Sequence, residues 1–398
     1  MKRTITASHR HWLDDELLAW QSEGLIDAPT AAAINERYDV VQTRRLNLAR
    51  LLLLVGAAFV GIGVIWLIAA NLDELSPMVR LAAVFGLFAA AVVGAERLAG
   101  RRAHGGAIPS PVVIGMRLLA TLLLGGVIFQ AAQSLQVPAF EPGLLGLWAV
   151  GALLYAYLTR SVLPLLVGVA TGLIWLIAST MTAHPSGLGF VLVMFAAALL
   201  AVCLSHLDSP NGFAIVWRET GAALTLVGLF AAAVPGIDED DFGWSFGLVL
   251  VAAAAAVALA VAALRRRTTL AQALGEPLGV VLLGAIAVLL VFWEAGEDPA
   301  NVDFASWVHA AVAVTVYVAA ALGVAYLGIV HDSVRLTIVA TAALVVFTTF
   351  QAFAVFAQII QGAWLFVFLG LVLAGSGYLF DRARREMASA VADEGANA

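Results

Sequence analysis

The chain has 398 residues, of which 62% are hydrophobic and only 12% are charged, and its formal net charge is −6. Soluble domains carry about 25% charged residues, so this chain has too little polar surface to cover a water-soluble core of its size. Its single cysteine, Cys203, excludes an intramolecular disulfide and any site built from several thiolates.

Residues 1–45 differ from the rest of the chain, because they are polar and mixed in charge, and we expect them to form a cytoplasmic αα-hairpin. Gly24 is predicted to end the first helix, and Asp27 with Pro29 to begin the second. The segment lacks the apolar core and cleavage site of a secretory signal peptide. The first apolar run that follows is therefore expected to direct membrane insertion.

Large apolar side chains recur at near-helical spacing on the first helix of this hairpin. On the second helix they recur at positions i and i+4. A hairpin this short buries too little surface to be stable alone, so it needs a partner surface. That partner is the membrane domain of the same chain, a second copy, or another membrane protein. The predicted docking residues are Trp12, Leu13, Leu17, Trp20, Ile34 and Tyr38.

From residue 46 to residue 380, apolar stretches alternate with short polar breaks, and most stretches have the length of about 20 residues that a helix needs to cross a bilayer. We predict an all-α transmembrane bundle, followed by a basic, disordered tail at 381–398. The twelve predicted spans are residues 46–70, 77–98, 112–134, 143–159, 162–180, 187–205, 213–234, 244–264, 276–293, 304–330, 334–353 and 362–380.

The distribution of charge tests this threading independently. With twelve spans, every lysine and arginine except Arg80 falls on one side of the bilayer, while acidic residues such as 238–241 gather on the other. Basic residues in short loops mark the cytoplasmic side. The sequence therefore predicts a membrane protein with both termini in the cytoplasm and the lipid bilayer as its main partner.

Several stretches resemble a bacterial family of predicted membrane proteins, the domain of unknown function 2157. The stretches that carry the resemblance read HWLDDELLAWQSEGLIDAPTAAAI, IWLIAANLDELSPMVR, GGVIFQAAQSLQVP and, near the end, FVFLGLVLAGSGYLFDRARRE. The resemblance implies a protein of the bacterial cytoplasmic (inner) membrane with a polytopic fold. It implies no particular activity.

Polar side chains in the outer halves of the spans form one candidate site. Glutamines at i and i+3 share a helix face, and amides suit a neutral polar or lipidic substrate because they both donate and accept hydrogen bonds. The alternative is simple hydrogen bonding between spans. The candidate cavity residues are Asn71, Arg80, Gln130, Gln133, His309, Gln351, Gln358 and Gln361.

Arg80 is the exception to the charge pattern. Ser76 and Pro77 are predicted to begin the second span, which places Arg80 one turn inside it. Its side chain either extends outward to Asp73 or Glu74, or anchors an anionic headgroup or substrate.

Signatures of catalysis are missing from the sequence. His309 has no second histidine at metal-ligand spacing, and no phosphate-binding loop or nucleophile motif occurs, so we expect neither a metal nor a cofactor. The charged groups of the spans, such as Glu96, Arg117 and Glu276, lie near the inner interface instead of mid-span, which argues against a proton-coupled transporter. Dispersed arginines give no support to nucleic-acid binding.

Three functions remain open. The leading hypothesis is a non-enzymatic binding or scaffolding protein that uses the N-terminal hairpin for docking. The second is a transporter or flippase for a neutral polar or lipidic substrate, lined by the outer glutamines. The third is an intramembrane enzyme acting on lipid or glycan, with His309 as its base.

Overall fold

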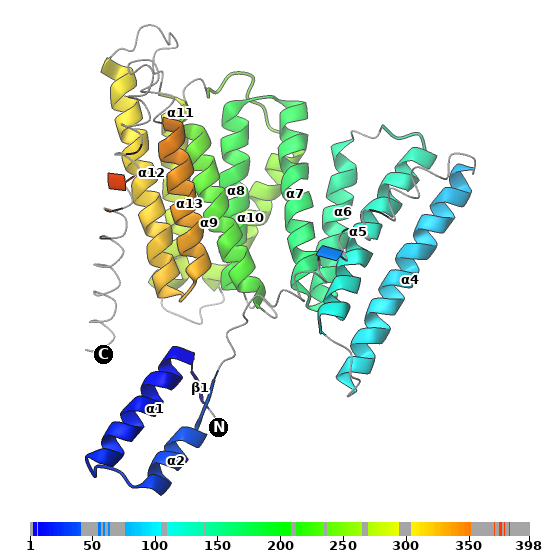
Figure 1. Cartoon of the computed structure of the whole chain (residues 1–398). Coiled ribbons are helices and arrows are strands. Elements are labelled where there is room, and N and C mark those ends of the chain that lie inside the picture. Colours follow the sequence, from blue (N-terminus) through cyan, green and yellow to red (C-terminus); the bar gives the residue numbers. More distant parts are fainter. Residues whose placement is uncertain are drawn as a thin grey trace.

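The computed structural model describes nine segments: residues 3–5, 7–40, 76–104, 110–138, 141–207, 212–234, 237–264, 270–293 and 304–351. It also describes the isolated positions 55, 56, 59, 63, 370, 374, 375, 378 and 382. Within this part of the chain, a small N-terminal unit precedes a large helical bundle (Figure 1).

The bundle contains ten described helices that run up and down in chain order. They are α4 (Pro77–Ala103), α5 (Ser110–Ser134), α6 (Pro142–Thr159), α7 (Val162–Ala183), α8 (Gly187–His206), α9 (Phe213–Ala232), α10 (Phe246–Leu264), α11 (Leu270–Val291), α12 (Phe304–Val330) and α13 (Val334–Gln351). Nine of these are long and apolar enough to cross a membrane, and α11 contributes the shorter apolar stretch Gly275–Val291. The predicted all-α polytopic fold is confirmed. The spans predicted at 46–70 and 362–380, and the tail at 381–398, fall outside the described segments, apart from isolated positions.

The N-terminal unit contains α1 (Ala7–Ser22) and α2 (Ala28–Glu36), flanked by the strands β1 (Arg3–Ile5) and β2 (Tyr38–Val40). Gly24 has the left-handed φ of 71° that ends the first helix. Asp27 caps α2 by accepting a 3.0 Å hydrogen bond from the Thr30 backbone N–H. Both helix boundaries agree with the prediction.

The placement of Tyr38 on the second helix was wrong. The helix ends at Glu36, and Tyr38–Val40 pairs in parallel with Arg3–Ile5. An aromatic residue and a β-branched valine favour a pleated strand, and the first residues of the chain supply the partner. This pairing joins the two ends of the unit.

The helix α7 is the central connection of the bundle. It packs against α6 on one side and against α8 and α10 on the other, so α4–α6 form one group and α8–α13 another (Figure 1). Near the start of α9, the two groups also meet directly, because Trp217 Nε1 donates a 3.0 Å hydrogen bond to the hydroxyl of Tyr157 on α6. Tyr157 also packs edge-on against the buried ring of Phe213.

The larger group is close-packed around α8 and α9. A Cβ added to Gly221 of α9 would lie 2.6 Å from Val202 of α8, and one added to Gly228 would lie 2.9 Å from Phe195. A Cβ added to Gly284 of α11 would lie 3.1 Å from the same phenylalanine ring. Glycine at these positions lets the helices approach closely, as is usual between membrane helices.

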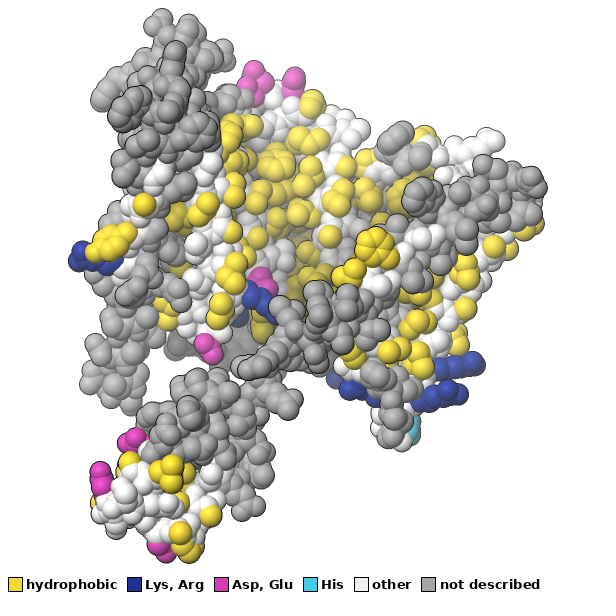
Figure 2. All heavy atoms as spheres, in the orientation of Figure 1, with side chains coloured by type: hydrophobic (Ala, Val, Ile, Leu, Met, Phe, Trp, Pro, Cys, Tyr) yellow, Lys and Arg dark blue, Asp and Glu magenta, His cyan; other side chains and the backbone are white. Residues whose placement is uncertain are grey.

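The two ends of the bundle differ in charge. Among the described helices of the bundle, every arginine except Arg80 lies at the end where α4, α6 and α8 finish, which we call the arginine end. Residues Asp238–Asp241 lie in the loop at the opposite end. Figure 2 shows basic side chains around the finish of α4 and acidic side chains at the far end.

The flanks between these ends are apolar. On α6, the outward-facing residues Leu147, Val150, Leu154 and Leu158 recur at helical spacing, and each is at least 60% exposed. Such a wide exposed apolar face is explained by contact with lipid. The chain is therefore a multi-pass membrane protein.

Candidate functional site

A cluster of ionisable side chains lies at the arginine end of the larger helix group. Glu276, near the start of α11, is at its centre, with a side chain only 12% exposed. Its Oε1 lies 2.6 Å from His331 Nε2, and its Oε2 lies 3.2 Å from His206 Nε2 and 3.5 Å from Arg218 Nε. One carboxylate thus faces two imidazoles and one guanidinium.

Each partner of Glu276 comes from a different part of the fold. His206 is the last residue of α8, Arg218 lies in the second turn of α9, and His331 follows the end of α12. These helices all reach the arginine end there, so their terminal polar residues meet although they are up to 125 positions apart in sequence. A second ion pair, Arg335 to Glu219 at 3.6 Å, lies on the neighbouring surface between α13 and α9.

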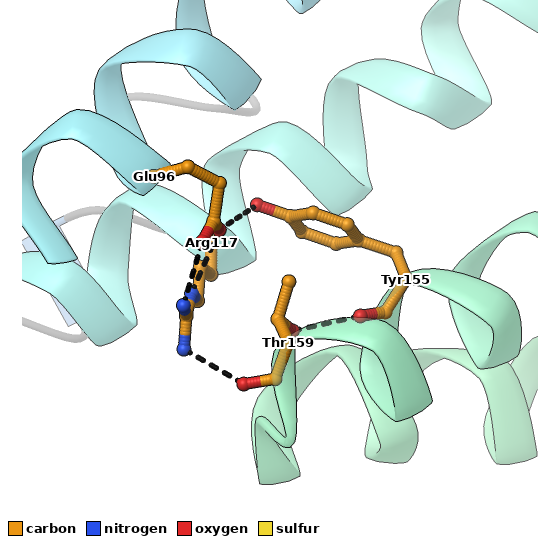
Figure 3. A network of polar contacts seen from close by, with 4 residues as sticks. All are labelled: Glu96, Arg117, Tyr155 and Thr159. Atoms are coloured by element: carbon orange, nitrogen blue, oxygen red, sulfur yellow. Dashed lines mark hydrogen bonds and ion pairs between the residues drawn. The ribbon is translucent and has the colours of Figure 1, made fainter. Parts of the chain in front are cut away.

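The other helix group has its own polar network at the same end (Figure 3). Arg117 of α5 donates to both carboxylate oxygens of Glu96 on α4, at 3.0 and 2.8 Å, in a bidentate pair. The Tyr155 hydroxyl of α6 donates to the same carboxylate at 3.0 Å. Arg117 Nη1 donates to the backbone carbonyl of Thr159 at 3.0 Å.

The contact with Thr159 has a clear structural role. The last carbonyls of a helix have no partner within the helix, and Arg160 turns the chain sharply away with a left-handed φ of 51°. The guanidinium of Arg117 therefore caps α6 while it holds α4. This network ties the three helices of the smaller group together at the arginine end.

The described members of the predicted cavity lie in separate places. Gln130 and Gln133 are on α5, where the first is partly buried and the second exposed. His309 and Gln351 are buried on α12 and α13. Since α5 and α12 lie on opposite sides of the bundle, the structure does not bring these pairs together (Figure 1). Asn71, Gln358 and Gln361 lie outside the described residues.

His309 and Gln351 each bond to a helix backbone. His309 Nε2 lies 3.2 Å from the carbonyl of Leu290, and its ring packs edge-on against Trp293. Gln351 donates a 3.2 Å hydrogen bond to the carbonyl of Ala233, the C-cap of α9. Both contacts satisfy carbonyls near helix ends, which is the interhelical role considered from the sequence.

Arg80 lies one turn inside α4, as predicted, with Ser76 as the N-cap and Pro77 as the first helical residue. Its side chain is partly buried. The two acidic partners proposed for it, Asp73 and Glu74, are outside the described residues. Its role in binding stays a prediction.

In the N-terminal unit, several predicted docking residues pack inward. Leu13 and Leu17 are buried with Ala31, and Trp20, Ile26 and Ile34 pack partly buried against them. The exposed apolar side chains of the unit are instead Leu18 and Leu25, at 64% and 67%. The side chains of Trp12 and Tyr38 are outside the described set, so the docking role of the six residues stays a prediction.

From the sequence, the charged residues near the inner interface gave only an argument against a proton-coupled transporter. Their assembly into two networks was not predicted. Part of the signal was present, because Glu96, Arg117 and Glu276 were all predicted near the inner interface, whereas His206 and His331 were not singled out. Which of them face one another depends on helix rotation and neighbours, and these are tertiary properties.

No group of three or more histidine, cysteine, aspartate or glutamate side chains suited to a metal ion occurs among the described residues. A search of curated proteins and a search of solved structures found no match. Residues 18–165 do match a sequence family whose description is "Predicted membrane protein", domain of unknown function 2157.

The match runs from the middle of α1 to the start of α7 and confirms the resemblance inferred from the first three sequence stretches. It includes all four residues of Figure 3 and ends well before Glu276. The description of the family names no activity. Over residues 18–165 the chain is therefore similar to the predicted membrane proteins of domain of unknown function 2157.

Proposed function

We propose that this membrane protein acts by binding, as a scaffold in a bacterial cytoplasmic membrane, and that its N-terminal unit docks on the arginine end of a second copy. The observation that carries the proposal is the surface of the N-terminal unit. The sequence of residues 14–36 contains six carboxylates and no lysine or arginine. Among the described side chains, Glu23 and Asp27 are exposed, as are Leu18 and Leu25, so the described surface is both acidic and apolar.

Charge selects the docking partner. Anionic lipids on the cytoplasmic leaflet attract basic segments and repel carboxylates, so a bare membrane surface is a poor partner for this unit. The arginine end carries Arg97, Arg101 and Arg102 at the finish of α4 and Arg335 at the start of α13. Complementary charge both speeds association and selects against wrong partners.

Topology supports the same arrangement. Basic residues mark the cytoplasmic side, and the N-terminal unit precedes the first predicted span on that side. Two copies in one bilayer hold their arginine ends at the same depth, within reach of each other's N-terminal units. Docking between copies would then assemble the scaffold.

The test is cross-linking in native membranes. A photo-reactive amino acid replaces Leu18 or Leu25, and a control replaces Ala32, an exposed alanine of α2. Two differently tagged copies are expressed together. We expect the leucine positions, and not the control position, to cross-link one copy to the other, with a yield that falls as salt concentration rises.

Two results would contradict the proposal. Cross-links confined to a single chain would show docking without assembly. Equal yields from Leu18, Leu25 and Ala32 would show that the contact is random collision.

The alternatives have less support. Transport through one outer cavity needs Gln130 and Gln133 to face His309 and Gln351, and these pairs are on helices that do not adjoin. Intramembrane catalysis by His309 needs a free ring nitrogen beside a carboxylate, and its Nε2 faces the carbonyl of Leu290.

A further inference from the structure

The two networks at the arginine end differ in how completely their hydrogen bonds are satisfied. In Figure 3, all three nitrogens of the Arg117 guanidinium donate to oxygens at 3.0 Å or less. In the Glu276 cluster, Arg218 Nε, His206 Nε2 and Glu276 Oε2 are buried and have no hydrogen-bond partner. Their contacts at 3.2 and 3.5 Å are ion-pair contacts without hydrogen-bond geometry.

The missing hydrogen bonds of the Glu276 cluster are informative, because burying polar groups without hydrogen bonds costs free energy. A cluster with only structural duties would gain from full pairing, as the Arg117 network does. Ionisable groups held together near a membrane-spanning region are therefore candidates for function. Histidine is the residue whose charge changes between pH 5 and 8.

We propose that His206, Glu276 and His331 form a proton-binding site that fastens α8, α11 and the α12–α13 turn together when the imidazoles are protonated. A protonated His331 makes a charge-assisted hydrogen bond with Glu276, and a protonated His206 makes an ion pair with the other carboxylate oxygen. A neutral imidazole can still donate one hydrogen bond to the carboxylate, but it carries no positive charge to attract it. Proton binding thus adds charge attraction at two helix contacts.

Arg218 fixes the charge state of the carboxylate. Its permanent charge lies 3.5 Å from Glu276 and favours the ionised carboxylate at any pH in the histidine range. Glu276 is then the fixed charge of the cluster, and the histidines are the groups that change.

Other charged and titratable groups surround the cluster. Arg218 and Glu219 come from α9, and Arg335 of α13 pairs with Glu219. Asp332 is exposed in the turn beside the cluster, and Tyr326 is 40% exposed near the end of α12. Helix α10 packs against α11 and carries no titratable side chain between its described ends. Carboxylates, arginine and tyrosine titrate outside pH 5–8 unless strongly perturbed.

The helix that carries Glu276 is interrupted at the next residue. Pro277 lies inside α11 and has no backbone N–H, so the carbonyl of Ala273 loses its usual helical partner. The residues of α11 before the proline are therefore held less firmly by their own helix and depend more on the cluster. A change in the cluster can reposition this first part of α11 while Gly279–Val291 stays packed.

The experiment measures the thermal stability of the full-length protein in nanodiscs from pH 5.5 to pH 8.5. Because charge attraction is present below the imidazole range and lost above it, the wild-type melting temperature should fall by about 2–4 °C as pH rises through that range. The double variant H206Q/H331Q should lose this fall. The control H104Q should keep it, because His104 is exposed at the end of α4, in the other helix group, where its Nδ1 bonds to the carbonyl of Gly100.

The single variants H206Q and H331Q keep the test decisive if the double variant does not fold. Each should lose about half of the wild-type pH dependence, since each removes one of the two imidazole contacts. If both single variants retain the full wild-type pH dependence, or if H104Q loses it, the proposed proton site is wrong.

Discussion

Replacing Arg117 tests whether the network of Figure 3 holds the smaller helix group together. The variant R117A removes three donated hydrogen bonds, two to Glu96 and one to the carbonyl of Thr159. The variant R117K keeps the positive charge, but an ammonium group cannot reproduce the planar, bidentate contact. Comparing R117A with R117K separates the contribution of the positive charge from that of the planar hydrogen-bond geometry.

The expected magnitude follows from burial. A hydrogen bond to a charged group contributes about 1.5–3 kcal/mol when buried. The Arg117 side chain is 16% exposed, but that of Glu96 is 41% exposed, so water replaces part of what is lost. We expect R117A to lower the free energy of unfolding by about 2–3 kcal/mol, and R117K by about 1 kcal/mol.

The assay is reversible unfolding of the purified full-length protein in mixed micelles, with R101A as the control because Arg101 is exposed one turn further along α4. A double-mutant cycle with E96Q should give a coupling energy of about 1–2 kcal/mol, since the two side chains are in direct contact. If R117A is as stable as R101A, or if the cycle shows no coupling, the network does not stabilise the bundle and our reasoning fails.

Three further predictions concern packing, pH and orientation. Changing Gly221 to leucine should destabilise the contact of α8 with α9 by about 1–3 kcal/mol. Changing Gly86 to alanine should have little effect, because nothing lies within 4 Å of a Cβ added there. Thermal melting of both variants measures the difference. Hydrogen bonds from the Thr30 hydroxyl and backbone N–H lower the pKa of the Asp27 carboxyl below its usual value. The cap therefore stabilises α2 above the ordinary carboxylate range and loses this effect as pH falls through the lowered pKa, so amide hydrogen exchange in α2 should accelerate in acid and, at neutral pH, in D27A. In a background without the native cysteine, an impermeant thiol reagent should label D240C in intact cells and H104C only after permeabilisation, and the reverse pattern would overturn the orientation.

Much of the fold could be predicted from the sequence because of the solvent. In a bilayer, a spanning backbone must satisfy its own hydrogen bonds, so each apolar stretch of sufficient length forms a helix whatever its neighbours do. This is why the predicted span at 143–159 coincides with α6, although it is among the shortest. Local chemistry also placed Gly24, Asp27 and Ser76 at helix ends. Each of these features depends on a few adjacent residues.

In the N-terminal unit, local sequence patterns did not predict two features of the structure. Tyr38 has helical spacing from Ile34, yet it lies in a strand because Arg3–Ile5, more than thirty residues earlier, offers a pairing edge. Leu17, one of the predicted docking residues, is buried against Ala31 of the other helix. In both cases a contact distant in sequence overrides the local pattern.

The sequence by itself determined which residues enter the membrane, where most helices begin and end, and that the arginines gather at one end. These properties follow from hydropathy, capping and charge, which are read one segment at a time. Only the tertiary structure decided that Glu276 meets two histidines while Arg117 spans three helices, and that Gln130 lies away from His309. Those pairings depend on how each helix is rotated and which helices are its neighbours, and such contacts arise only when the whole bundle packs.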